Sequence, residues 1–150
     1  MEISKCWNSK NDVESYIRKY FIPVDSNTTF DTLFPCTANY INAVDSLSFL
    51  GMRVEQCWVK KEGSLYAFFI LIHESQGLEE AISSVYGNPR IKAQTYANDT
   101  PLGREYNVWQ DGDINLELVS FRNLTKTKRY ENCELLIAGN MSRRQLTGRH

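Results

Sequence analysis

The sequence has few of the patterns that usually announce a reaction or a cofactor. It contains no GxGxxG, no GxxxxGK[ST] and no CxxC or CxH pair, and only two of its 150 residues are histidines. The first two absences argue against the common nucleotide-binding loops, and the third against the usual half-sites of a structural zinc. We therefore expect no cofactor and no bound metal.

Long hydrophobic runs are also missing. The longest, 67–72, has six residues, whereas a helix that crosses a bilayer needs about 20. Residues 1–21 show neither the basic start nor the apolar stretch of a secretory signal. We therefore expect a cytoplasmic protein whose thiols are reduced and buried rather than paired. The cysteines are far apart in the chain: Cys6, Cys36, Cys57 and Cys133.

An excess of positive charge is absent as well, since the formal net charge is −1. This argues against a uniformly basic nucleic-acid binder. The charge is unevenly divided: residues 1–120 hold 10 basic and 16 acidic side chains, whereas 121–150 hold 7 and 2. Such an asymmetry indicates a charged partner or self-association.

The residues that are present suit one folded domain. Hydrophobic residues make up 42% of the chain and aromatic residues 12%, which is enough apolar surface for a core without disulfides. We predict a single α+β domain over 1–140. The remaining segment, 141–150, is basic and has no apolar period, so we expect a loose tail.

Hydrophobic spacing predicts two helices and two hairpins. Apolar residues recur at helical intervals over 10–21, and a second helix begins near 78. One hairpin pairs 47–60 with 64–73, whose apolar strand is expected to be central. The other joins 105–109 to 114–121 through a turn that contains Asp-Gly.

The remaining segments are less regular. A last strand over 133–138 is expected to close the sheet, and 24–46 is the least legible part, with a short helix near 37–44. Strands outnumber helices and come as hairpins, so the fold class is α+β. We expect a single antiparallel sheet of five to seven strands with two main helices on one face.

The stretch from Leu78 to Leu118 resembles a helix–sheet module of small bacterial proteins. Its helix ends in Tyr86-Gly87-x-Pro89, and its second hairpin carries Tyr106-x-x-Trp109. In that module the YGxP closes the helix and the aromatic hairpin packs over it. The resemblance implies a fold and no chemistry.

The whole chain resembles bacterial immunity proteins of the contact-dependent or polymorphic-toxin kind in its size, charge and lack of catalytic motifs. That resemblance implies a cytosolic, non-enzymatic inhibitor that binds a cognate toxin with a basic surface, such as a nuclease, and occludes its active site. The candidate contacts are acidic residues of the hairpins: Glu55, Glu62, Asp111 and Asp113. Two aromatic residues are candidate anchors where either faces outward: Tyr106 and Trp109.

Two other hypotheses stay open. A small hydrolase or nuclease would use His73 as a general base, beside Glu74 or a nearby cysteine, although a strand-end histidine is more often structural. A nucleic-acid-binding or assembly module would use the basic segment 122–149, with phosphate contacts from Lys126, Lys128, Arg129, Arg143 and Arg144. The Asp111-Gly112-Asp113 turn lacks the further ligands of a calcium loop.

Overall fold

The computed structural model describes residues 2–25, 38–94, 105–120, 133–142 and 145–146. The helical elements are η1 (Ile3–Asn8), α1 (Lys10–Tyr20), η2 (Glu74–Gln76) and α2 (Leu78–Tyr86). The first strands are β1 (Phe21–Pro23), β2 (Tyr40–Asn42), β3 (Ser48–Phe49), β4 (Met52–Arg53) and β5 (Gln56–Glu62). The others are β6 (Leu65–His73), β7 (Ile91–Gln94), β8 (Glu105–Asp111), β9 (Ile114–Ser120) and β10 (Cys133–Gly139). Within this described part, no helix has the length and apolar character needed to cross a membrane.

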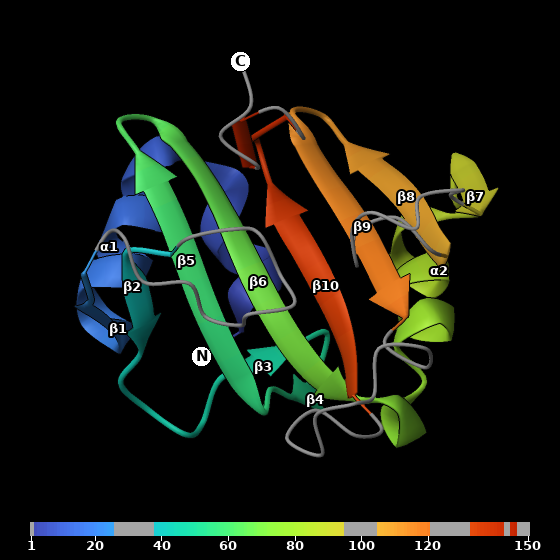
Figure 1. Ribbon diagram of the computed structural model, residues 1–150, viewed down its shortest axis with the longest axis horizontal. Coiled ribbons are helices and arrows are strands. Elements are labelled where there is room, and N and C mark those ends of the chain that lie inside the picture. The colour runs from blue at the N-terminus through green and yellow to red at the C-terminus, as the bar shows by residue number, and fades with distance from the viewer. Residues whose placement is uncertain (1, 26–37, 95–104, 121–132, 143–144, 147–150) are drawn as a thin grey trace.

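Eight strands form one sheet in the order β1-β2-β5-β6-β10-β9-β8-β7, and every neighbouring pair is antiparallel. The other two described strands, β3 and β4, pair with each other. Both α-helices lie on one face of the large sheet (Figure 1). The α+β class, the antiparallel sheet and the placement of the helices are confirmed. The sheet exceeds the expected five to seven strands because β1 and β2, with three residues each, are too short to show an alternating pattern.

The segment around β2 pairs with β5 partly through side chains. The Asn39 amide group donates to the carbonyl of Lys61 and accepts from its N–H, both at 2.8 Å. Asn42 Oδ1 accepts from the N–H of Cys57 at 3.1 Å. The prediction of a short helix near 37–44 is therefore wrong for the described residues of that segment. Asparagines are typical of loops, but here their side chains extend the hydrogen bonding between β2 and β5.

Strands β6 and β10 are the centre of the sheet, with buried side chains on both faces. Alternate residues of β6 serve two cores: Phe68, Ile70 and Ile72 pack beneath the helices, whereas Phe69 and Leu71 point to the other side. We call these the helical face and the second face. The run 67–72 is buried, as predicted, and the last strand is inserted between β6 and β9 rather than at an edge.

Part of the segment 141–150 packs on the second face. Met141 and Leu146 have only 4% and 3% of their surface exposed and belong to that core. The ammonium of Lys60, itself buried, donates to the carbonyls of Gln145 (3.0 Å) and Leu146 (3.3 Å). Residues 143–144 and 147–150 lie outside the described residues.

Candidate functional site

The turns of both hairpins and the C-terminal end of β10 lie at the same end of the sheet, which we call the turn end (Figure 1). The β5–β6 turn spans 62–65 and the β8–β9 turn spans 111–114. Three predicted contact residues are exposed there: Glu62, Asp111 and Asp113. The antiparallel register thus brings together acidic residues that are far apart in the sequence.

A cleft of about 490 Å³ opens at the turn end, on the helical face. Residues of η1 and the first turns of α1 form one wall, and the two hairpin turns form the others. Its apolar lining comes from Trp7, Val13 and Ile114, and its acidic lining from Glu14, Asp111 and Asp113. The volume lies within the range of about 300–1,000 Å³ that is typical of ligand sites.

The neighbouring lysines neutralise this acidic lining only at Glu14. Lys61 Nζ donates to the carbonyl of Gly63 at 2.8 Å and lies 3.6 Å from the Glu14 carboxylate. Lys60 points to the second face, where it binds backbone carbonyls and lies 3.9 Å from Glu62. Glu62 therefore shares the turn end with Asp111 but extends from the opposite face of the sheet.

Tyr66 lines the cleft with a side chain that is only 7% exposed. Its N–H donates to Asn140 Oδ1 (2.8 Å) and its carbonyl accepts from the Asn140 N–H (3.1 Å). Its hydroxyl makes no hydrogen bond with the residues that the structure describes. Burial raises the pKa of Tyr66 to about 12, with further contributions from the nearby Cys6 and Asp113, so the phenol is neutral at pH 7.

Two polar side chains fix the walls of the cleft. Asn140 Nδ2 donates to the carbonyl of Ser64 at 3.1 Å and thereby holds the β5–β6 turn against the end of β10. Ser9 Oγ accepts from the N–H of Asp12 at 3.2 Å and caps the N-terminus of α1. The cleft therefore rests on regular elements rather than on a free loop.

No protein-family model, curated protein or solved structure matches this chain. The geometry of the cleft is therefore the basis for assigning a function. Of the twelve lining residues, the sequence predicted only Asp111 and Asp113 as contacts; those it missed include Trp7, Glu14, Tyr66 and Asn140. None of them belongs to a local motif, and they meet only because η1 and α1 pack at the turn end of the sheet.

Trp109 is not an outward-facing anchor. It is 1% exposed, and its indole N–H donates to the carbonyl of Gly87 at 2.9 Å. Gly87 ends α2 with a positive φ, and its N–H donates to the carbonyl of Ser83. Trp109 therefore stabilises the end of α2, and it does not meet the condition of facing outward on which its prediction as an anchor depended. The side chain of Tyr106 lies outside the described residues.

Glu55 is exposed but lies at the end of the sheet opposite the turns, where its N–H donates to the carbonyl of Leu71 at 2.8 Å. The register places it far from Asp111 and Asp113, at the other end of β5. It therefore does not belong to the cleft.

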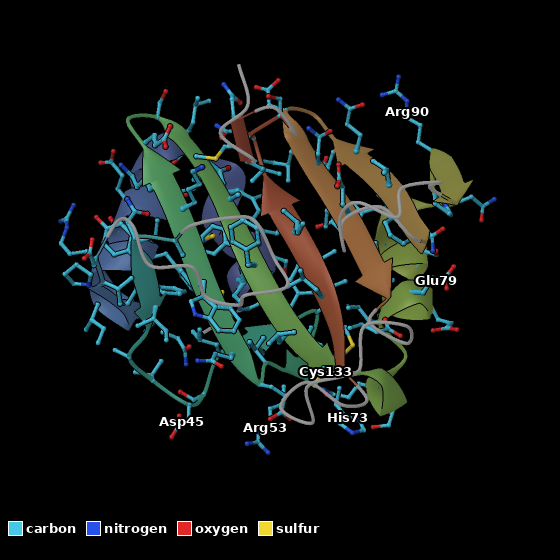
Figure 2. The ribbon with its side chains drawn as sticks, viewed as in Figure 1. Asp45, Arg53, His73, Glu79, Arg90 and Cys133 are labelled. Atoms are coloured by element: carbon cyan, nitrogen blue, oxygen red, sulfur yellow. The ribbon has the colours of Figure 1, made fainter. Side chains whose placement is uncertain are left out.

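His73 and Cys133 also lie at that opposite end, as Figure 2 shows, and are directly opposite each other on β6 and β10. His73 Nδ1 lies 2.8 Å from Ser75 Oγ and accepts from the N–H of Ser75 at 3.2 Å. The ring thus closes the turn that begins η2. The side chain of Glu74, its expected partner, lies outside the described residues.

Two of the four thiols are buried and free, as predicted. Burial raises the pKa of Cys6 to about 12, and that of Cys57 also lies well above its ordinary value because of burial. Both thiols are therefore protonated and unreactive at pH 7. Cys133 is half-buried, and Cys36 lies outside the described residues.

Most of the basic segment 122–149 lies outside the described residues, including Lys126, Lys128, Arg129, Arg143 and Arg144. Within the described ranges, no three His, Cys, Asp or Glu side chains form a group that could hold a metal ion. Asp111 and Asp113 flank the glycine of a hairpin turn.

Proposed function

We propose that this protein is a non-enzymatic binding module of the immunity type, which acts in the cytoplasm and neutralises a cognate toxin by covering its basic active site. The observation that carries this proposal is the cleft at the turn end, which is lined by Glu14, Asp111 and Asp113 together with a half-buried tryptophan, Trp7. Such a surface combines negative charge with an aromatic contact.

The electrostatics suit a partner that acts on nucleic acid. A nuclease must present a basic groove to phosphates, and an inhibitor of opposite charge associates rapidly and excludes the substrate. Here the carboxylates of Asp111 and Asp113 form no ion pair with a described residue, whereas Lys61 already lies next to Glu14. The proposed contact surface is therefore net acidic among its described residues.

Aromatic residues contribute most strongly to many interfaces when they lie at the centre of the contact. Trp7 is suited to this role, because it lines the cleft and keeps part of its surface exposed. It contacts the core through Phe49 and Phe68, with ring centroids 6.1 and 6.3 Å away. Trp7 therefore replaces Trp109 as the candidate anchor.

The proposal is tested first by isolating the partner. The tagged protein is used to capture proteins from an extract of its native host, with and without nuclease treatment. A stoichiometric protein that survives nuclease treatment, and whose toxicity is neutralised by the captured chain, supports the proposal. Nucleic acid alone, or no partner, contradicts it.

The second step measures association with that partner. Replacing Asp111 and Asp113 by lysine should slow association about tenfold at low salt and weaken its dependence on ionic strength. The matched control replaces Glu55 and Glu80, two exposed residues outside the cleft, by lysine and changes the net charge equally. Equal slowing in both double variants would mean that total charge, and not the turn end, governs binding.

A further inference from the structure

We infer that the cleft at the turn end binds an arginine side chain of the partner protein, with the guanidinium between Asp111, Asp113 and the hydroxyl of Tyr66. This inference rests on the proposed function for the source of the arginine. The chemistry of the cleft itself can be tested without the partner.

The lining of the cleft matches the two parts of an arginine side chain. Val13, Ile114 and Trp7 provide apolar surface for the methylene stem, which such side chains commonly bury while their charge stays near polar groups. Asp111 and Asp113 provide carboxylates on the same cleft. A cationic side chain therefore meets apolar surface along its stem and negative charge at its head.

The hydroxyl of Tyr66 is the second, independent observation. The side chain is more than nine-tenths buried and lines the cleft, yet its oxygen lacks a hydrogen-bond partner within the described ranges. Asp113, which contributes to the raised pKa of this phenol, lines the same cleft. A donor that enters the cleft therefore meets two acceptors on its lining.

Arginine fits better than lysine for two reasons. Its guanidinium has five N–H donors in one plane and can bond several acceptors at once, whereas an ammonium has three. Its flat face also stacks on aromatic rings, and Trp7 provides such a ring at the cleft. Glu14 faces the same space but already lies next to Lys61, which leaves the aspartates as the main carboxylate partners.

The test titrates the full-length protein with three small probes: Nα-acetyl-arginine amide, its lysine counterpart and its neutral citrulline counterpart. Binding is followed by the indole N–H signal of Trp7 in ¹H–¹⁵N NMR spectra. Trp58 is the internal reference, because it is buried in the core of the second face. We expect a saturable shift of Trp7 with arginine in the millimolar range, binding at least about threefold weaker with lysine, and none with citrulline.

Variants test whether the aspartates and the Tyr66 hydroxyl are responsible for the shift of the Trp7 signal. The double variant D111N/D113N keeps side chains that favour turns and should weaken arginine binding about tenfold. The matched control E55Q/E80Q removes the same amount of charge elsewhere and should bind as the original chain does. Tyr66→Phe removes one oxygen and should weaken binding about threefold while the Trp58 signal stays in place.

Four results would overturn the inference: no saturable shift of Trp7, equal binding of citrulline, equal binding of lysine, or unchanged binding by D111N/D113N. The outcome is separable from that of the proposed function. A partner whose association depends on Asp111 and Asp113, together with no response to the arginine probe, rejects the arginine site alone. Probe binding without any protein partner rejects the proposed function alone.

Discussion

The two ends of the sheet use their polar side chains differently. At the turn end, Asp111, Asp113 and the hydroxyl of Tyr66 face a cleft and make few contacts with the described chain. At the opposite end, the polar groups bond to the protein itself: His73 binds Ser75. Polar groups that are already satisfied stabilise the fold, whereas unsatisfied ones are available to a partner.

Glu2 is the strongest example at the opposite end. Its carboxylate accepts from the N–H groups of Leu50 (2.7 Å) and Gly51 (2.9 Å), from the Ser48 hydroxyl, and from Ser4. Partial burial opposes its ionisation, but these hydrogen bonds outweigh burial and lower its pKa below the ordinary value of 4.5. The carboxylate of Glu2 thus links the N-terminal segment to the β3–β4 turn.

The largest effect is expected at the turn end of the two central strands. A Cβ atom on Gly139 would lie 2.2 Å from the carbonyl oxygen of Tyr66 and 2.8 Å from the Cα atom of Ala67. Backbone cannot yield as a flexible side chain does, so Gly139→Ala should lower the free energy of unfolding by about 3 kcal/mol. Urea denaturation followed by circular dichroism measures this change.

The control lies at the other end of the same strand pair. Cys133 is half-buried opposite His73, and Cys133→Ala should lower the free energy of unfolding by no more than about 1 kcal/mol. Similar losses in both variants would contradict the close approach of β6 and β10 at Gly139.

Much of the fold follows from local patterns, but the strand order does not. The helix over 10–20 and both hairpins were predictable because hydrophobic spacing and a turn with Asp-Gly are local signals. The position of β10 between β6 and β9 is set by pairing between distant segments. The strong apolar run of β10 fits a central strand, yet the spacing of residues in the sequence does not predict which strands lie beside it.

The site was predictable only in part. The exposure of Asp111 and Asp113 was predictable because they lie in a hairpin turn. The distance of Glu55 from them was not, because strand direction decides at which end of the sheet a residue lies. Trp109 was misplaced because a tryptophan in a hairpin suits either face, and here its indole caps α2. The role of Tyr66 depends on its position in the lining of the cleft, which a sequence cannot show.

The second prediction tests the charge at the opposite end. At pH 7, Glu2→Gln should lower the free energy of unfolding by about 1–2 kcal/mol, because its hydrogen bonds lose a charged acceptor. A carboxylate whose pKa is lowered by folding stabilises above its unfolded pKa, and this contribution disappears as the pH falls through its folded pKa. Urea denaturation at pH 7 and pH 3 should therefore show a difference between the two proteins that shrinks in acid.

Glu55→Gln is the control for that prediction, since Glu55 is exposed at the same end of the sheet. It should change the free energy of unfolding by less than about 0.5 kcal/mol at either pH. A difference for Glu2→Gln that is equally large at pH 3 and pH 7 would show that packing, rather than charge, accounts for its effect.

The smallest effect is expected for His73→Ala, which tests whether the opposite end is only structural. The substitution removes one local contact with Ser75, so the free energy of unfolding should fall by about 0.5–1 kcal/mol, and neutralisation of the partner should be unchanged. Urea denaturation and the neutralisation assay measure the two quantities. A folded variant that no longer neutralises the partner would place the functional centre beside His73 and Cys133 and favour a hydrolase. A residue that only closes a turn should affect stability and not activity.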